Sequence, residues 1–458
     1  MIEMTLAEIA GHLGGRLLNA ENGGEGIRIS RVETDSRKDA LGSLFVCLKG
    51  DNFDGHDFAK AACDKGALAL ITDRELPVPV PQIIVPDTLR GLGLIGQLNR
   101  RKSRARVVAV TGTCGKTTVK EMTAAILSRM GNTIATQGNF NNSVGVPLTL
   151  LTIDAATDYA VIELGASHPG DIAWTVEFAE PEAALINNVG GAHLLGFGGF
   201  EGVYRAKSEI LDYVFAGRKP AGKGAVNADN EFYSRWRQDY AGRDLSSFGV
   251  NNPEADVRAL DIRSLDNGAF AFRLVTPAGE GEIKLSLPGR HNVSNALAAA
   301  TLAGFAGAGL SDIIAGLEAQ KPVPGRLFVE KLGSLTLIDD SYNASFNAVE
   351  ASLDTISLLP GHRVFVFGDM GELGDDAPDL HTRIGEYARG RVDEFWSIGE
   401  LAALSARAFG GRAFSSRDEL LEAVRDLVNR VPDLTITAKG SHSMKMGEVA
   451  ELIRSMKA

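Results

Sequence analysis

The sequence predicts an α/β protein of three domains, with a mainly parallel sheet in the central one. Its 458 residues are too many for one hydrophobic core and suit two or three domains. In two regions, short β-branched runs alternate with helix-like stretches, a rhythm typical of parallel sheets covered by helices. Two prolines and a glycine in KPVPGR separate these regions. We therefore place the domains at residues 1–102, 103–325 and 326–458.

The first hundred residues predict a small α/β domain. A short helix pattern at the start is followed by short strands, of which SLFVCLKG (43–50) and ALALIT (67–72) are the clearest. The basic run RRKSRAR (100–106) comes at the end of this domain. Such a run is more often a solvated linker or helix end than a nucleic-acid site.

The two later domains both alternate strands and helices. In the central domain, the run RVVAVTG (106–112) predicts a buried parallel strand. A helix pattern follows in TVKEMTAAILSRMG (118–131), with Gly131 as a plausible C′ residue. The other expected strands and helices are YAVIELGA (159–166), DIAWTVEFA (171–179), AALINNV (183–189), HRVFVFGD (362–369), LHTRIGEYARG (380–390), EFWSIG (394–399) and LTITAKG (434–440). The last four predict a Rossmann-like C-terminal domain.

Composition excludes several classes of protein. A formal net charge of -11 argues against a nucleic-acid partner, because such binders usually carry a basic face. Three cysteines without CxxC or Cys/His spacing indicate neither a disulfide framework nor a zinc site. The start lacks the features of a signal peptide, and no apolar run is long enough to span a bilayer. We expect a soluble, cytoplasmic protein without membrane insertion, and a monomer.

The segment TGTCGKTT (111–118) predicts a phosphate-binding loop between a strand and a helix. Its glycines allow backbone N–H groups to approach phosphates at a helix N-terminus, a lysine adds positive charge, and a threonine hydroxyl can bind Mg²⁺. Only two residues separate the first glycine from the Gly-Lys pair, so the loop is a shortened form. Cys114 could be read as a nucleophile, but no general base follows from its spacing, and a bystander in the turn is favoured. The candidate nucleotide-binding residues are Gly112, Thr113, Cys114, Gly115, Lys116, Thr117 and Thr118.

From this loop onward the chain resembles the Mur ligase superfamily, which also includes folylpolyglutamate synthetase. The loop TGTCGKTTVKEM carries the resemblance, and further matches extend it through each domain and over nearly the whole chain. The resemblance implies three domains, ATP as a substrate and an amide bond made through an acyl phosphate. A P-loop kinase or a nucleotide-gated binding module is the alternative from another class, and the N-terminal domain argues against it.

Three residues are candidates for binding magnesium together with Thr117. Glu163 ends a predicted strand, where the active residues of parallel sheets collect, although such a residue is often structural. His193, in a glycine-rich segment, would by itself more often be a hydrogen-bonded structural residue. Lys207 would by itself be an exposed helix lysine. The resemblance implies that Glu163 and His193 bind two Mg²⁺ ions, and that Lys207 matches a lysine that is often carbamylated.

Two asparagines are candidates for binding adenine. Asn292 and Asn295 lie one helical turn apart in LPGRHNVSNALAAATLA, and their amides can pair with a donor and an acceptor on one base edge. Alternatively, Asn292 caps the following helix. The resemblance also implies that Arg326 reaches the γ-phosphate and that Asp340 contacts the ribose or the hinge. With Arg326, the candidate catalytic residues are Lys116, His193 and Lys207.

The ends of the chain predict the other substrates. TDSR (34–37) and LFVCLKGDNFDGHDF (44–58) resemble the UDP-sugar domain of the family's two later ligases. GDMGELG (368–374) followed by His381, and KGSHSM (439–444), resemble the branch that adds a dipeptide. That branch takes UDP-N-acetylmuramoyl-tripeptide and D-alanyl-D-alanine. The candidate substrate-binding residues are Ser36, Arg37, Lys49, Phe53, Asp54, Gly55, His56, Asn139, Asn142, Tyr342 and Asn343.

Two departures and one alternative accompany this interpretation. The family usually continues SYNANP, whereas this chain has Ala344, Ser345 and Phe346, and it usually has arginine where His442 stands. The ligase that adds the third peptide residue is the alternative within the family. It carries a DNPR-type motif for its amino acid, which this sequence does not contain.

Overall fold

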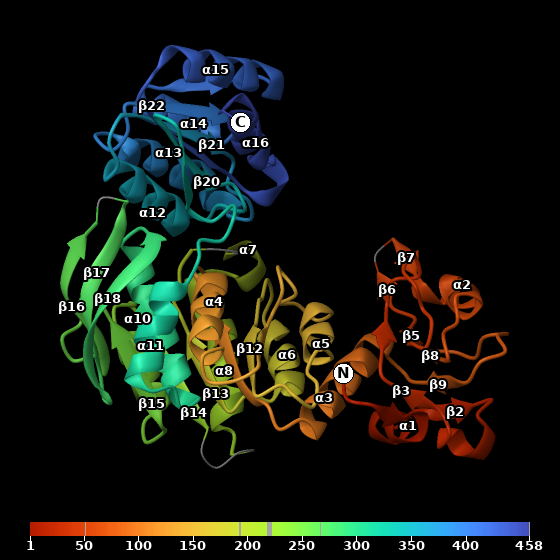
Figure 1. Cartoon of the computed structure of the whole chain (residues 1–458). Helices are drawn as coiled ribbons and strands as arrows, with labels where there is room; N and C mark the ends of the chain where they lie inside the picture. Colours follow the sequence, from red (N-terminus) through yellow and green to blue (C-terminus); the bar gives the residue numbers. More distant parts are fainter. Residues whose placement is uncertain (51, 192–193, 218–221, 266, 458) are drawn as a thin grey trace.

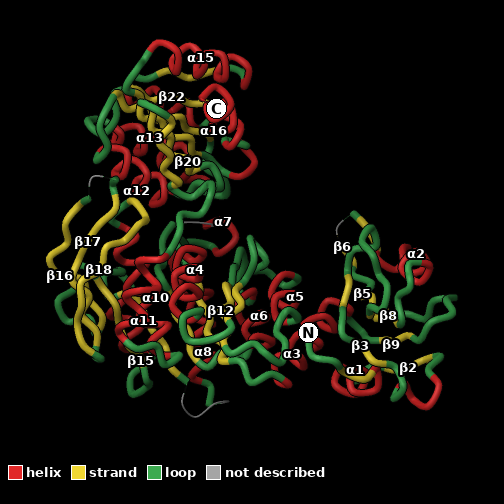
Figure 2. Tube along the Cα trace, in the orientation of Figure 1, coloured by secondary structure: helices red, strands yellow, loops and turns green. Residues whose placement is uncertain are grey.

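The computed structural model describes residues 1–50, 52–191, 194–217, 222–265 and 267–457, folded into three α/β units in chain order (Figure 1). Each unit is built on its own sheet of five, nine or six strands. Helices cover these sheets, as the secondary-structure colouring in Figure 2 shows. The predicted α/β class with three domains and a mainly parallel central sheet is confirmed.

The N-terminal unit holds the five-stranded sheet, in the order β2-β9-β8-β5-β4. Only β2 runs antiparallel to its neighbour. Its elements are β1 (Met4–Thr5), α1 (Leu6–Leu13), β2 (Arg16–Leu18), β3 (Arg28–Ile29), β4 (Val32–Glu33), β5 (Leu44–Val46), β6 (Lys49–Gly50), β7 (Phe53–Asp54), α2 (Ala59–Asp64), β8 (Ala69–Thr72), β9 (Gln82–Ile84) and α3 (Thr88–Lys102), with 3₁₀ turns at Glu21–Gly24 and Gly55–Phe58.

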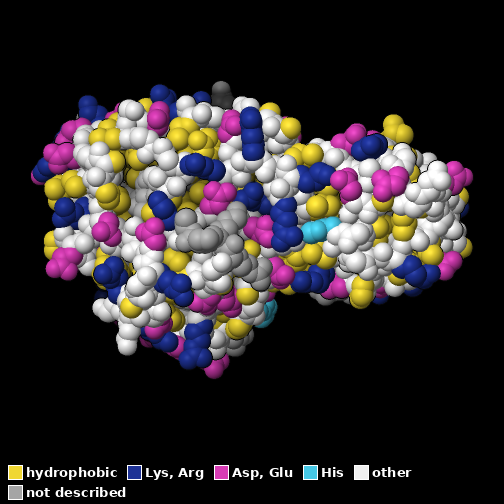
Figure 3. Space-filling model, turned by 90° about the horizontal axis from the view of Figure 1, so that it is seen from below, with side chains coloured by type: hydrophobic (Ala, Val, Ile, Leu, Met, Phe, Trp, Pro, Cys, Tyr) yellow, Lys and Arg dark blue, Asp and Glu magenta, His cyan; other side chains and the backbone are white. Residues whose placement is uncertain are grey.

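Helix α3 joins this unit to the central one. It packs against α5 (Gly145–Leu150) and α6 (Asp171–Ala179), and Gly93 allows the close approach, because a Cβ there would lie 2.7 Å from the Phe178 ring. The basic run ends this helix and is paired with acids: Arg101 lies 2.6 Å from Glu180. The run is therefore a helix end, and its ion pair with Glu180 links the N-terminal and central units. The waist between the N-terminal unit and the rest is visible in Figure 3, where acidic and basic side chains intermingle.

The central unit holds the nine-stranded sheet, in the order β11-β12-β10-β13-β14-β15-β16-β17-β18. Strands β11 to β16 are parallel, and two antiparallel pairings add β17 and β18. Besides α5 and α6, its elements are β10 (Arg106–Thr111), α4 (Lys116–Leu127), β11 (Thr133–Ala135), β12 (Tyr159–Glu163), β13 (Ala183–Ile186), α7 (Leu194–Phe197), α8 (Phe200–Phe215), β14 (Lys223–Asn227), α9 (Tyr233–Asp239), β15 (Leu245–Gly249), β16 (Val257–Ser264), β17 (Ala269–Thr276), β18 (Gly279–Pro288), α10 (His291–Phe305) and α11 (Leu310–Ala319).

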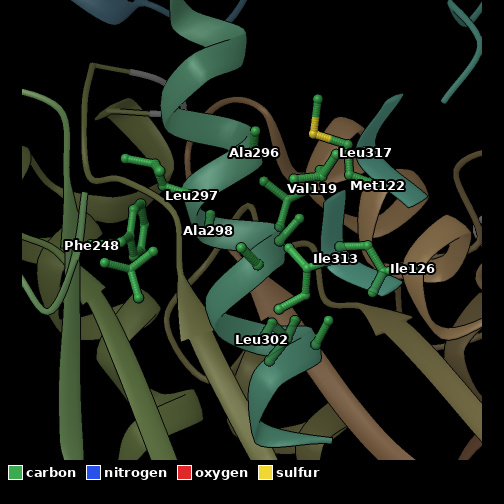
Figure 4. Close-up of a cluster of buried hydrophobic side chains, with 14 of the residues drawn as sticks. Val119, Met122, Ile126, Phe248, Ala296, Leu297, Ala298, Leu302, Ile313 and Leu317 are labelled. Carbon is green, nitrogen blue, oxygen red and sulfur yellow. The ribbon is translucent and has the colours of Figure 1, made fainter. Parts of the chain in front are cut away.

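The core of the central unit fixes the helix that follows the phosphate loop. Figure 4 shows Val119, Met122 and Ile126 of α4 meeting the alanine-rich α10 and Ile313 of α11. Small side chains on α10 let it lie close to both α4 and the sheet. Side chains of α5, α6 and α8 form a second core on the other face. The position of α4 is thus set by packing on several sides.

The C-terminal unit holds the six-stranded sheet, in the order β19-β20-β24-β21-β22-β23, parallel except for β19. Its elements are β19 (Phe328–Leu332), β20 (Leu335–Asp340), α12 (Phe346–Ser357), β21 (His362–Gly368), α13 (Ala377–Ala388), β22 (Glu394–Ile398), α14 (Ala402–Phe409), β23 (Arg412–Phe414), α15 (Arg417–Arg430), β24 (Leu434–Lys439) and α16 (Gly447–Lys457), with 3₁₀ turns at Gly374–Asp376 and His442–Met444. Across the described part of the chain, no helix has both the length and the apolar character needed to cross a bilayer.

The helix after the phosphate loop ends earlier than predicted. Ser128 caps α4 in a right-handed conformation, so Gly131 is not a C′ residue in a left-handed conformation. The chain leaves the helix through tight turns, in which the N–H groups of Arg129 and Met130 bond to carbonyls three residues back. These turns satisfy the last carbonyls without a left-handed glycine.

Candidate active site

A cavity of about 1610 Å³ lies between the central and C-terminal units. Its floor is the carboxyl ends of the central strands, where ligands of open α/β sheets bind. Residues from the phosphate loop, from the start of α10 and from the C-terminal unit line it together. The predicted residues in its wall are Thr113, Cys114, Gly115, Lys116, Thr117, Thr118, Asn139, Asn142, Glu163, Asn292, Asn295, Arg326, Asp340, Tyr342 and Asn343.

The phosphate loop joins β10 to α4 and has the predicted form. Gly112 and Gly115 take φ values of 154° and 75°, and Gly115 is the N-cap of the helix in a left-handed conformation. The Lys116 ammonium donates to the carbonyls of Gly112 (2.8 Å) and Thr113 (3.2 Å), so it lies over the turn. Burial lowers the pKa of Lys116, and the charge of Arg326 lowers it further. Lys116 and Arg326 both line the cavity.

Two asparagines that were not predicted hold this loop in place. Asn188 accepts the Cys114 N–H (2.8 Å), and its amide donates to the Cys114 carbonyl (3.1 Å). Asn187 also donates to that carbonyl, at 2.9 Å. Both follow β13, which pairs with β10 in parallel, so their position comes from strand register. The sequence did carry a signal for these two asparagines, because they lie at the carboxyl end of the predicted strand AALINNV. Polar residues at that end of a central strand lie at the same edge of the sheet as the phosphate loop.

The carboxylate of Glu163 lies beside the phosphate loop, and its residue is 2% exposed. Glu163 is paired with Val110 across β10 and β12, and its Oε2 accepts the hydroxyl hydrogen of Thr117 at 2.9 Å. Its Oε1 accepts from Asn141 at 2.8 Å. Thr136 receives the Glu163 N–H at 2.9 Å. A hydroxyl and a carboxylate in contact form a hard oxygen donor set, which suits Mg²⁺.

Asn139 and Asn142 were the residues predicted in this loop. Asn141, which lies between them, is the one that contacts Glu163. Asn139 and Asn142 are exposed in the cavity wall, and the Asn142 Oδ1 accepts N–H bonds from Val144 (3.2 Å) and Gly145 (2.8 Å) at the start of α5. The sequence alone could not separate three asparagines in GNFNNS, because loop backbone geometry decides which one points inward.

Lys207 is 2% exposed on α8, and burial lowers its pKa to about 7, with a further contribution from Lys116. Its ammonium lies 5.4 Å from the centre of the Phe197 ring. The alternative of an exposed helix lysine is therefore wrong. His193 lies outside the described residues. Within the described ranges, no three His, Cys, Asp or Glu side chains form a cluster able to hold a metal by themselves. Magnesium in phosphate sites commonly uses only one or two protein carboxylates.

The two predicted adenine residues are buried at the start of α10, each 5% exposed. The Asn292 amide donates to the Pro288 carbonyl (2.7 Å), and the Asn295 amide donates to the Asn292 Oδ1 (2.9 Å). The alternative that Asn292 caps the helix is wrong, because Arg290 is the N-cap and has no side-chain capping bond. Asn292 is already inside the first helical turn.

Arg326 and Asp340 lie at the connection to the C-terminal unit. The Arg326 guanidinium lies 4.3 Å from the centre of the Tyr342 ring, a stacking geometry that fixes the planar group. Asp340 accepts the Leu327 N–H at 3.1 Å and pairs with the ammonium of the buried Lys439 at 2.7 Å. Its carboxylate therefore binds the backbone at the connection between the two units, and the predicted contact with the ribose or the hinge stays a prediction.

The C-terminal unit touches the phosphate loop directly. The Cys114 Sγ lies 3.1 Å from the Ser345 Oγ, in a segment that departs from the family pattern. Near it, the loop 370–373 is held by His381, which is fully buried and accepts the Met370 N–H at Nε2 (2.9 Å). Its Nδ1 donates to the Ala377 carbonyl (2.7 Å). Burial lowers the His381 pKa.

The predicted UDP-sugar residues lie on the N-terminal unit and do not line the described cavity. His56 is buried, with its Nδ1 2.5 Å from Asp54 and its Nε2 accepting the Asp73 N–H at 3.0 Å. It orients Asp54 and has no exposed face. Phe53, in contrast, is 57% exposed. The other candidates in the same region are Ser36, Arg37, Lys49 and Gly55, of which Lys49 pairs with Asp73 and Arg37 with Asp35.

Three family models match successive parts of the chain. They are the Mur ligase family catalytic domain at residues 28–93, the Mur ligase middle domain at 110–303 and the Mur ligase glutamate ligase domain at 325–442. The UDP-N-acetylmuramoyl-tripeptide–D-alanyl-D-alanine ligase of Escherichia coli K12 is 44% identical over 457 residues, with 99% of both chains covered. The chain belongs to the Mur ligase family.

Solved structures of Mur ligases agree with this assignment. A crystal structure of MurF from Acinetobacter baumannii matches with a TM-score of 0.93 and 34% identity, and the match covers 99% of both chains. The MurF ligase of Thermotoga maritima in complex with ADP matches with a TM-score of 0.81 and 27% identity, covering 93% of this chain and 97% of that one. These matches span all three units of the chain.

Proposed function

We propose that this chain joins D-alanyl-D-alanine to UDP-N-acetylmuramoyl-tripeptide in an ATP-dependent reaction that passes through an acyl phosphate. The observation that carries the proposal is the juxtaposition of a phosphate loop, a Thr117–Glu163 oxygen pair and Arg326 in one cavity between two units. The full-length similarity to ligases of that name supports the choice of substrates.

The first step forms the acyl phosphate. A carboxylate oxygen of the tripeptide attacks the γ-phosphorus of ATP, and ADP leaves with the electrons of the broken P–O bond. The loop N–H groups, Lys116 and Arg326 are positioned to stabilise the charge on the transferred group. Because phosphoryl transfer leaves little covalent work for a protein, positioning and electrostatics supply most of the rate.

The second step forms the amide. The neutral amine of the dipeptide attacks the acyl carbon and loses a proton, and phosphate departs with the former carboxylate oxygen. Water would compete with the amine, so the cavity must close over the intermediate. The contact between Cys114 and Ser345 supports an arrangement in which the C-terminal unit closes on the loop.

Thr117, Glu163 and Lys207 would hold magnesium in this site, with His193 as a fourth candidate. Magnesium bound there would supply positive charge to neutralise the phosphates. Lys207 suits carbamylation, because a pKa of about 7 leaves much of the amine neutral and able to react with carbon dioxide near neutral pH. The carbamate would then offer oxygen atoms, which the unmodified amine lacks.

The remaining candidates divide between the two substrates. We assign Phe53, Lys49 and Arg37 on the N-terminal unit to contacts with the UDP-muramoyl end of the substrate. His56 is buried and contacts Asp54. We place the dipeptide near Tyr342 and Asn343. His442 also lines the cavity there, with its ring centre 5.8 Å from that of Tyr342.

The proposal is tested by offering two pairs of substrates with ATP and Mg²⁺. We expect phosphate release and a product heavier by one dipeptide from UDP-N-acetylmuramoyl-tripeptide with D-alanyl-D-alanine. The second pair is UDP-N-acetylmuramoyl-dipeptide with a diamino acid. A product from the second pair alone would identify the ligase that adds the third residue. Hydrolysis of ATP that is indifferent to the amine would favour a kinase or a gated binding module.

A further inference from the structure

A buried lysine lies one helical turn behind the phosphate loop, and the proposed mechanism does not use it. Lys120 is on α4, three residues after Thr117, so the two side chains lie on the same side of the helix. Lys120 is 1% exposed, and its ammonium donates to the Thr136 carbonyl at 2.6 Å. Glu121 pairs with the same ammonium at 2.5 Å. Burial of a charge is costly unless the charge is paired and hydrogen-bonded, and here both conditions are met.

The bond from Lys120 changes how strand β11 ends. Strands β11 and β12 are parallel, and the Thr136 N–H donates to the Val161 carbonyl at 3.0 Å. The next bond of a regular parallel ladder would run from the Glu163 N–H to the Thr136 carbonyl. In this structure that carbonyl accepts from Lys120, and the Glu163 N–H bonds to the Thr136 hydroxyl instead, at 2.9 Å. The side chains of Lys120 and Thr136 therefore replace one ladder bond, and the chain leaves the sheet at this point.

The end of β11 determines where the following loop begins. This loop carries Asn141, whose amide donates to the Glu163 Oε1 at 2.8 Å. The Asn141 carbonyl accepts the Gly165 N–H at 2.8 Å, so the loop lies against the backbone that follows Glu163. The loop is therefore held at two points, by Lys120 where it leaves the sheet and by Gly165 where it reaches Glu163.

We propose that Lys120 is a positioning residue for magnesium binding, because it directs the loop that brings Asn141 to Glu163. Both carboxylate oxygens then depend on α4: Thr117 donates to Oε2, and Lys120 holds the loop that donates to Oε1. Among the described residues, the cavity wall does not include Lys120, so the lysine acts through the loop and not on a ligand. Outer partners of this kind orient a metal-binding group. The inference rests on the proposed function for the role of Glu163 at the metal.

A lysine that serves only the stability of the fold is the alternative. Its loss would lower the unfolding temperature without changing the affinity for a divalent cation. The two interpretations therefore differ in metal affinity and in the order of the loop, and a change in thermal stability alone favours the alternative.

The first measurement is Mn²⁺ binding in the presence of ADP, followed by the electron paramagnetic resonance signal of free Mn²⁺. Lys120→Met keeps an unbranched side chain but cannot donate. We expect its Mn²⁺ affinity to fall about tenfold, the lower end of the range for outer partners of a metal ligand. Thr123→Val is the matched control, because Thr123 is fully buried on the same helix and its hydroxyl donates to the Val119 carbonyl (2.7 Å) within that helix. It should keep the wild-type affinity.

Hydrogen exchange in the absence of metal and nucleotide is the second measurement. We expect faster exchange of the amides at residues 137–145 in Lys120→Met, and wild-type exchange there in Thr123→Val. Wild-type Mn²⁺ affinity or wild-type exchange in Lys120→Met would overturn the inference. A wild-type chain that binds no Mn²⁺ in the presence of ADP would overturn it too.

A pair of Thr136 variants replaces Lys120→Met if that variant does not fold. Without the hydroxyl, the Glu163 N–H competes with Lys120 for the Thr136 carbonyl. We therefore expect Thr136→Val to lose Mn²⁺ affinity and Thr136→Ser to keep it, and equal affinities in the two would overturn the inference.

Neither measurement requires an amide to form. If the chain makes no amide but Lys120→Met still loses Mn²⁺ affinity and loop protection, the proposed reaction fails and the inference stands. If the wild type joins the dipeptide and Lys120→Met keeps both properties, the inference fails and the proposed reaction stands.

Discussion

The hydroxyl of Thr117 donates a 2.9 Å hydrogen bond to the carboxylate of Glu163, so the first turn of α4 and the end of β12 share one oxygen cluster. Strand pairing places Glu163 beside Val110, and the loop that follows Val110 returns to Thr117. The register of two parallel strands therefore creates the pair. The other carboxylate oxygen of Glu163 accepts from the Asn141 amide at 2.8 Å, so both oxygens are held in place.

Glu163→Gln should lower phosphate release by about 100-fold to 1000-fold, in the range for loss of one preorganised electrostatic group in an active site. The amide keeps the shape but removes the charge that neutralises magnesium. Glu254→Gln, an exposed carboxylate, is the control. Phosphate release measured over a range of Mg²⁺ concentrations checks the prediction. An unchanged magnesium dependence in the Glu163 variant would show that the carboxylate does not serve the metal.

Gly115→Ala should abolish nucleotide binding. A Cβ there would lie 2.5 Å from two asparagine side chains, and the φ of 75° adds strain for any residue other than glycine. Gly410→Ala separates the two effects, because Gly410 has a φ of 90° but no atom within 4 Å of the added Cβ. Both variants should lower thermal stability, whereas only Gly115→Ala should lose ADP affinity by calorimetry. Equal ADP affinity in both variants would contradict the prediction.

Tyr342→Leu should lower kcat/KM for ATP by roughly 2-fold to 30-fold, which corresponds to about 0.5–2 kcal/mol for a cation–π contact. The leucine removes the ring on which Arg326 lies, at 4.3 Å. Tyr342→Phe keeps the ring and should stay close to wild type. Steady-state kinetics on both variants is the measurement. Equal losses in the two would assign the effect to the hydroxyl and not to the support of Arg326.

His381 should make the C-terminal unit sensitive to acid. Burial lowers its folded pKa below 6.5, so the unfolded chain binds more protons than the folded one between the folded pKa and 6.5. Its contribution to stability is present above pH 6.5 and is lost as the pH falls, by up to about 1.4 kcal/mol per pH unit. His381→Gln does not titrate there and should show a smaller change in thermal stability between pH 7.5 and 5. An identical acid dependence would contradict the prediction.

The repeated strands and helices of the last two domains could be predicted because their hydrophobic runs are strong and periodic. RVVAVTG, YAVIELGA and LTITAKG all form buried strands where they were expected. The phosphate loop was also predictable, since TGTCGKTT combines glycines with a lysine and a threonine at fixed spacing. The end of α4 was not, because the turn at Ser128 needs no glycine signal.

The parts of the site that sequence reasoning missed depend on contacts between distant segments. Asn187 and Asn188 belong to the site because β13 lies next to β10, and Asn141 belongs because its loop turns toward Glu163. His56 was a candidate contact for the UDP-muramoyl substrate, yet two aspartates enclose its ring. Hydrophobic period and motif spacing carry no information on which of several polar neighbours points inward.

The acyl phosphate is tested most directly by following oxygen from the tripeptide carboxylate. UDP-N-acetylmuramoyl-tripeptide labelled with ¹⁸O in its terminal carboxylate is incubated with ATP, Mg²⁺ and D-alanyl-D-alanine, and the released phosphate is examined by mass spectrometry. The proposed mechanism predicts one ¹⁸O atom in each phosphate released, because the attacking oxygen leaves with the phosphoryl group. Phosphate without label, formed together with the amide product, would contradict the acyl-phosphate mechanism.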